Sequence, residues 1–151
     1  MRIQTIMIVM NFMKQLNKLE SILYIIGGFT MTIGAGLYAF FLYQKFSCWL
    51  MLLGAIIFVS MQIRQKYLGT SVTIHRLRKI MFLSHACFLL AGVLMVEDAY
   101  NFIKPFFSSS IESYNLYVTI FYHNWVVLLL IAAILEAYSI HRISTELTKK
   151  H

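Results

Sequence analysis

The sequence has little charge for its length. Of its 151 residues, 60% are hydrophobic and only 13% are charged, and the mean hydropathy is +0.72. An average soluble domain carries about 25% charged residues, so this composition cannot supply a water-facing surface. Proline is almost absent as well, and the one copy, Pro105, leaves the long apolar runs uninterrupted. These deficits exclude an ordinary soluble domain and indicate a membrane protein.

Cysteine and catalytic motifs are also scarce. Cys48 and Cys87 are the only cysteines, and they fall in different apolar segments, so we expect no disulfide between them. This argues against a four-helix thiol oxidase, which needs paired cysteines on loops outside the membrane. The sequence has no glycine-rich nucleotide motif, no serine-centred elbow and no cysteine or histidine pair at metal-ligand spacing. We therefore expect no metal and no cofactor, and a non-enzymatic role is favoured over an intramembrane enzyme.

Four apolar segments are long enough to cross a bilayer. A hydrocarbon core of about 30 Å needs about 20 apolar residues in a helix, and the segments 21–43, 46–63, 80–97 and 118–140 match that length without an internal lysine or arginine. Helices are expected because backbone polar groups in lipid must be satisfied within the segment itself. The sequence thus predicts an all-α, four-transmembrane-helix antiparallel bundle that forms one membrane domain over residues 1–151.

The basic residues predict the orientation of the helices. They gather before the first segment, between the second and third, and after the fourth, whereas Lys45 and Lys104 are the only basic residues on the other side. That other side also holds Glu97, Asp98 and Glu112. The positive-inside bias therefore predicts an N-in, C-in protein of the bacterial inner membrane. The basic residues are Arg2, Lys14, Lys18, Arg64, Lys66, Arg76, Arg78, Lys79, Arg142, Lys149 and Lys150.

A net charge of +7 would suggest nucleic-acid binding on a soluble chain, but here most of the basic residues flank apolar segments. We expect membrane lipids, and no nucleic acid, as a partner. The predicted cytoplasmic basic loop is interpreted first as an ordinary topology signal, and second as a docking site for anionic headgroups or an acidic protein. This loop contains Arg64, Lys66, Arg76, Arg78 and Lys79.

Two ionisable residues, His85 and Glu136, fall well inside the predicted spans. Such groups are costly in hydrocarbon unless they are paired or neutral. Each lies six residues inside a basic residue, Lys79 or Arg142, which places both about 9 Å from the same end of the bundle. If the third and fourth spans are neighbours, the two side chains form an intramembrane polar pair.

Three interpretations of this pair are open. It can be a polar clasp that fixes helix register, or Glu136 can extend toward the cytoplasm and meet Arg142 or the basic loop. The third interpretation is a proton-linked transport or catalytic site, because a buried carboxyl group and a histidine can exchange protons near neutral pH. The sequence favours the first two.

Small residues on the first span predict close helix packing. Gly28, Thr32 and Gly36 recur every four residues on one face, where a second helix can approach within the chain or in a homo-oligomer. Two flanking segments have interfacial character. Residues 3–16 match an amphipathic helix on the membrane surface, and the aromatic-rich residues 98–122 match an outer aromatic belt rather than a binding groove.

The runs IHRLRKIMFLSHACFLLAGVLMV at 74–96 and NWVVLLLIAAILEAYSIHRI at 124–143 resemble a group of small uncharacterised bacterial four-helix integral membrane proteins. The resemblance covers the second half of the chain and implies the same fold, with no activity attached. We therefore predict a structural or interacting membrane component, alone or with a membrane-protein partner. The alternative is a small homodimeric transporter or channel that uses His85 and Glu136; the proline-free spans weigh against it.

Overall fold

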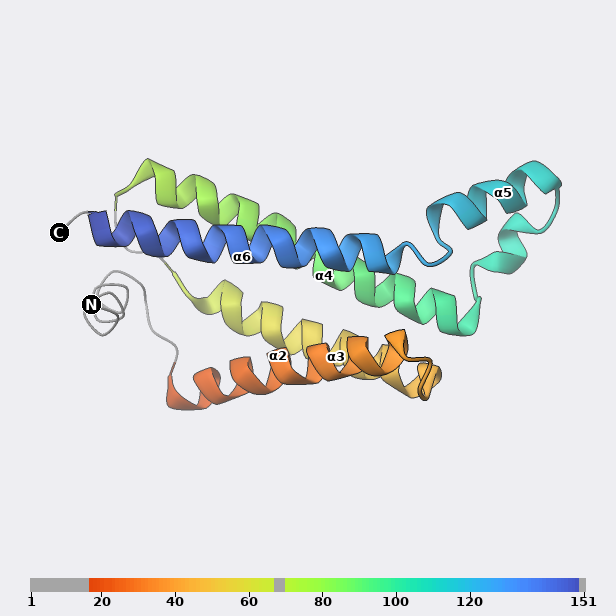
Figure 1. The fold of residues 1–151 in the computed structure, drawn as a ribbon, viewed down its shortest axis with the longest axis horizontal. Helices are drawn as coiled ribbons and strands as arrows, with labels where there is room; N and C mark the ends of the chain where they lie inside the picture. Colours follow the sequence, from red (N-terminus) through yellow and green to blue (C-terminus); the bar gives the residue numbers. More distant parts are fainter. Residues whose placement is uncertain (1–16, 67–69, 150–151) are drawn as a thin grey trace.

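The computed structural model describes residues 17–66 and 70–149, which form six helical segments (Figure 1). The predicted amphipathic helix at 3–16 lies outside the described residues. Four stretches are long and apolar enough to span a membrane: α2, α3, α4, and α5 together with α6. The predicted all-α class with four apolar spans is confirmed. The segments are α2 (Lys18–Ala39), α3 (Gln44–Arg64), α4 (Val72–Tyr100), the 3-10 helix η1 (Lys104–Phe107), α5 (Ile111–Ile120) and α6 (Trp125–Lys149).

The long helices pack as two pairs. α2 packs along α3, α6 packs along α4, and contacts between α3 and α4 join the pairs. Figure 1 shows that α2 and α4 begin, and α3 and α6 end, at the same end of the molecule. We call this the basic end, because most of the described basic residues lie there. They are Lys18, Arg64, Lys66, Arg76, Arg78, Lys79, Arg142 and Lys149.

The α2–α3 contact is close because glycines of each helix face the backbone of the other helix. A Cβ atom added at Gly54 would lie 2.4 Å from the backbone nitrogen of Met31, and one added at Gly34 would lie 2.5 Å from the backbone nitrogen of Met51. Neither position has room for a side chain. Gly27 makes the same kind of approach to Phe58, so the glycines that set this packing are Gly27, Gly34 and Gly54.

The predicted small-residue face points elsewhere. A Cβ atom at Gly28 would meet only the Phe58 ring, at 3.5 Å, and one at Gly36 would have nothing within 4 Å among the described residues. Within the described chain, α2 packs closely through Gly27 and Gly34 and not through Gly28 and Gly36; that the predicted face meets a helix of a second copy stays a prediction. Spacing reveals that small residues align on a helix, and it does not reveal which side meets the next helix.

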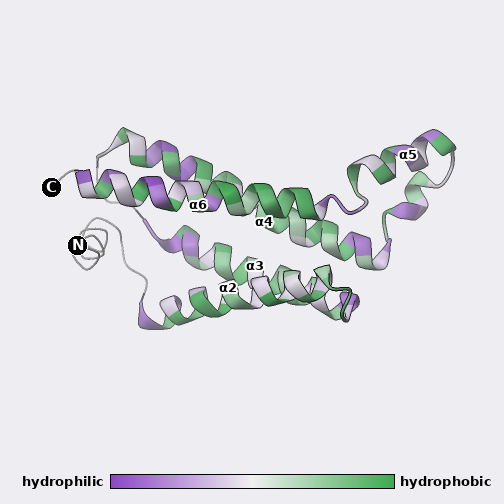
Figure 2. Ribbon diagram, viewed as in Figure 1, coloured by the Kyte–Doolittle hydropathy of each residue, from purple (hydrophilic) through white to green (hydrophobic). Residues whose placement is uncertain are grey.

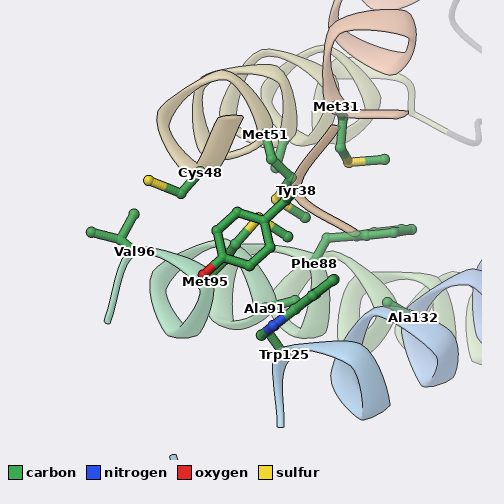
Figure 3. Packing of buried hydrophobic residues seen from close by; sticks show 11 residues of the cluster. Met31, Tyr38, Cys48, Met51, Phe88, Ala91, Met95, Val96, Trp125 and Ala132 are labelled. Atoms are coloured by element: carbon green, nitrogen blue, oxygen red, sulfur yellow. The ribbon is translucent and has the colours of Figure 1, made fainter. Parts of the chain in front are cut away.

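The apolar core lies between the helix pairs, and the outer surface is apolar as well. One buried cluster combines residues of all four long helices, including Tyr38, Met51, Phe88 and Trp125 (Figure 3). Large apolar side chains also cover the outside, where Leu130 is 60% exposed, and Figure 2 shows hydrophobic residues along the middle of every long helix. This distribution suits helices surrounded by lipid.

Two predicted spans contain turns that their apolar sequence conceals. The first span is predicted to reach residue 43, whereas α2 ends at Ala39 and Phe41 and Tyr43 then adopt φ values of 59° and 46°. The fourth is predicted as one helix over 118–140, whereas α5 ends at Ile120 and α6 begins at Trp125. Neither turn contains glycine or proline, so hydropathy alone misses both.

The side chain of Asn124 explains the second break. Its Nδ2 donates hydrogen bonds to the carbonyl oxygens of Thr119 and Ile120, at 2.6 and 2.9 Å. These carbonyls belong to the last turn of α5 and have no partner further along that helix. The preceding residue, His123, has a φ of 55°, which turns the chain into α6.

α4 begins at Val72, well before the predicted start at residue 80. Arg76, Arg78 and Lys79 therefore lie in its first two turns, and their placement in a loop is wrong. Arginine and lysine are good helix formers, and their long stems carry the charge away from the apolar surface. A helix can thus extend past the apolar run that hydropathy detects.

Candidate functional site

His85 and Glu136 meet inside the bundle. His85 extends from α4 and Glu136 from α6, and His85 Nε2 lies 3.5 Å from Glu136 Oε2. Both are buried, with exposed fractions of 3% and 7%. Next to them the Ser84 hydroxyl donates to the carbonyl oxygen of Ala132 at 2.7 Å, which fixes the register of the two helices. The structure thus brings together the two residues of the predicted polar pair.

A third residue, Gln62 of α3, joins this pair, although the sequence pattern did not predict it. Its Nε2 donates a hydrogen bond to Glu136 Oε1 and lies 3.4 Å from the sulfur of Met81. A signal was available, because an amide inside the predicted span 46–63 is itself costly in lipid and marks a packed face. We call Gln62, His85 and Glu136 the inner polar cluster.

The inner polar cluster has more hydrogen-bonding capacity than its own side chains use. Four of its atoms have no hydrogen-bond partner among the described residues: Gln62 Oε1, Glu136 Oε2 and both ring nitrogens of His85. The Ser139 hydroxyl, one turn further along α6, has none among these residues either. Buried polar atoms are rarely left in this state in native proteins. The described residues contain no group of three or more histidine, cysteine or acidic residues that could hold a metal ion.

Glu136 does not extend to Arg142. Arg142 Nη2 instead lies 3.7 Å from Glu146 Oε1, one turn further along α6, and the Glu136 carboxylate faces Gln62 and His85. The interpretation in which Glu136 reaches Arg142 is therefore wrong, because the polar partners on α3 and α4 lie closer to the carboxylate.

The predicted basic-loop residues divide into two groups. Arg64 forms an ion pair with Glu20 at the start of α2, and Arg78 donates a hydrogen bond to the backbone carbonyl of Gln65. These two therefore tie helix ends together. The other three are exposed: Lys66, Arg76 and Lys79.

A second polar cluster lies at the end opposite the basic end. Asp98 Oδ2 accepts a hydrogen bond from the Tyr38 hydroxyl at 2.8 Å and lies 2.9 Å from His123 Nδ1. The Asp98 side chain is 3% exposed, whereas that of His123 is 49% exposed. The ring of Tyr38 also meets Trp125 edge-on, with centroids 5.1 Å apart (Figure 3). One carboxylate thus connects α2, α4 and the start of α6.

Glu97, beside Asp98, is fully buried. Its Oε1 accepts from the Tyr117 hydroxyl at 2.8 Å, and its Oε2 accepts from the backbone nitrogen of Ile103 at 2.9 Å. It therefore holds the end of α4 to α5. From the sequence, Glu97 and Asp98 were predicted only as charges at the end of a span. Their position directly after an apolar run is a signal that could have indicated their burial.

Comparisons with protein-family models, with curated proteins and with solved structures find no match. The resemblance to small bacterial four-helix membrane proteins therefore stays a prediction.

Proposed function

We propose that this chain is a multi-pass integral protein of the bacterial inner membrane, folded as an antiparallel four-helix bundle with both termini in the cytoplasm. In this proposal the basic end faces the cytoplasm, in agreement with the positive-inside bias. The opposite end, which holds the second polar cluster around Asp98, faces the periplasm. The proposal is supported by four apolar helices whose outer surfaces carry large exposed hydrophobic side chains, such as Phe29 and Leu130.

We further infer that the chain acts as a structural or interacting membrane component. One observation carries this inference: among the described residues, nothing packs closely against the small-residue face of α2. A shallow groove of about 460 Å³ lies along this face and is lined in part by Gly28 and Thr32. Gly36 lies beyond it, where an added Cβ atom would meet no described residue within 4 Å. Helices associate in lipid through small residues that let their backbones approach, so the face suits a helix of a second copy or of another membrane protein.

Reporter fusions test the orientation. A green fluorescent protein fused after residue 151 is expected to fluoresce, and alkaline phosphatase at the same site to be inactive, because the carboxyl terminus is cytoplasmic. The chain is also expected to stay in the membrane through a carbonate wash. Phosphatase activity at the carboxyl terminus, or release by carbonate, would show that the topology is wrong.

Purification with native lipids tests the component role. The chain, extracted in polymer-bounded lipid discs, is expected to carry a stoichiometric second protein or a second copy of itself. Gly36→Leu fills the open face of α2 and is expected to remove the partner, whereas Ile33→Leu, at an exposed apolar position, keeps it. Recovery of the wild-type chain as a lone monomer would contradict the role.

A second candidate function is a small homodimeric transporter or channel. It is favoured by one specific observation, the burial of an acid and a base with unpartnered polar atoms in the inner polar cluster. In this candidate His85 and Glu136 line the route of the transported species.

A further inference from the structure

The inner polar cluster holds the Glu136 carboxylate in a defined orientation. Gln62 donates to Oε1, so that oxygen is already engaged by an uncharged amide. The other oxygen, Oε2, lies 3.5 Å from His85 Nε2 and has no hydrogen-bond partner among the described residues. The two atoms that can carry a proton therefore face each other.

The groups around Glu136 limit the charge states of the cluster. Among the described residues, His85 from α4 lies 3.5 Å from Glu136 and Tyr24 from α2 lies in its neighbourhood; α3 contributes the uncharged Gln62. With one proton shared by Glu136 and His85, the pair is neutral overall, either as two neutral groups or as a carboxylate beside an imidazolium. Without that proton a bare negative charge is left in the apolar interior, and with a second proton a bare positive charge is left there.

We propose that the inner polar cluster is a proton-binding site that takes up one exchangeable proton between Glu136 Oε2 and His85 Nε2. The ligand is the proton itself, and the unpartnered buried atoms on both groups are the feature that points to it. The proposal deepens the transporter candidate, which requires such a site. The site does not in turn require transport, since a proton can equally regulate the packing of α3, α4 and α6.

The proton exchanges with the basic end of the bundle. His85 and Glu136 each lie six residues from the nearest basic residue along their helices, Lys79 and Arg142, which corresponds to about 9 Å along the helix axis. The distance to the opposite end is longer, and the apolar side chains of Phe88, Ala91 and Ala132 belong to the core on that side.

Labelling with a lipophilic carbodiimide tests the proposal. Dicyclohexylcarbodiimide enters apolar regions and adds to protonated carboxyl groups: the acid proton moves to a carbodiimide nitrogen, the carboxylate oxygen bonds to the central carbon, and an oxygen-to-nitrogen acyl shift leaves a stable acylurea with no atom lost. The full chain in lipid discs is treated from about pH 5 to about pH 8, the range in which histidine sites change charge, and adducts are mapped by mass spectrometry. An adduct is expected on Glu136, with a yield that falls about tenfold across the range.

Three variants and an internal control sharpen the test. Glu136→Gln is expected to lose the adduct. His85→Gln is expected to keep the adduct but to change the pH dependence of its yield, because one of the two groups that share the proton is then missing. Gln62→Leu keeps both proton-binding groups and is expected to retain a pH-dependent adduct. Glu112, which is exposed, reports on carboxyl groups in water and is expected to react with a water-soluble carbodiimide instead.

Two results would overturn the proposal. The first is a wild-type chain that elutes as a folded species yet carries no adduct on Glu136 at any pH, as expected for a permanent ion pair. The second is an adduct whose yield does not change with pH. Neither result depends on which proteins co-purify or whether any solute is transported, so failure of the proton site is distinguishable from failure of either proposed function.

Discussion

The glycine contact between α2 and α3 provides a quantitative test of the fold. The Cβ atom of a Gly54→Ala variant would lie 2.4 Å from the backbone nitrogen of Met31 and 2.8 Å from its Cα. Ordinary van der Waals contact begins at 3.4 Å, so the two helices would have to separate by about 1 Å at this point. The neighbour is backbone, which cannot rotate out of the way as the end of a side chain can.

The expected loss follows from two opposing contributions. Overpacking of a close contact costs about 1–3 kcal/mol, and we expect the upper end because both atoms belong to helix backbones. Replacing glycine with alanine stabilises the helix by about 1 kcal/mol, because alanine has the higher helix propensity. The net destabilisation is therefore about 2 kcal/mol, or about 30-fold in the unfolding equilibrium constant. The added methyl group of Gly36→Ala meets no described residue within 4 Å, so this variant is expected to stabilise the protein by up to about 1 kcal/mol.

The assay is equilibrium unfolding in mixed micelles with increasing sodium dodecyl sulfate, followed by circular dichroism. The two variants change the same pair of residue types in the same helical hairpin, so an opposite sign isolates the contact from the substitution itself. A Gly54→Ala protein as stable as wild type, or a Gly36→Ala protein that is equally destabilised, would refute the packing described for α2 and α3.

Two further predictions concern the polar clusters. In the same unfolding assay, each of the variants His85→Ala and Glu136→Ala is expected to lower the stability by about 3 kcal/mol, because each leaves a buried partner unpaired. The double variant is expected to be no less stable than either single variant. Strictly additive losses would show that the two side chains are not coupled. Tyr38→Phe removes the hydroxyl that donates to Asp98, and it is expected to lower the free energy of unfolding by about 1–3 kcal/mol. In a chain whose other tryptophan is replaced by phenylalanine, it is also expected to shift the fluorescence emission of Trp125 to longer wavelength. Unchanged emission would show that this contact does not hold α2 to the start of α6.

Much of the fold can be predicted from the sequence because hydropathy is a local property. The four apolar spans, their helical state and the asymmetry of basic residues all follow from side chains read in order along the chain. The equal distance of His85 and Glu136 from the basic end follows in the same way, because each distance is the number of residues to the end of that residue's own helix. The turn at 40–43 and the break at 121–124 escape that reasoning, because phenylalanine, tyrosine and asparagine replace the usual glycine and proline there.

That this chain builds long apolar helices with basic residues gathered at one end can be predicted from its residues alone, because both features depend on composition along each segment. Which helix faces meet is visible only in the folded chain: α2 and α3 meet through Gly27, Gly34 and Gly54 rather than through Gly28, Thr32 and Gly36, and Gln62 lies beside Glu136. The cause is that each helix can rotate about its own axis. Apolar residues cover every side of these helices, so periodicity leaves the rotation of each helix undefined, and only the close fit between backbones and the pairing of buried polar atoms set it.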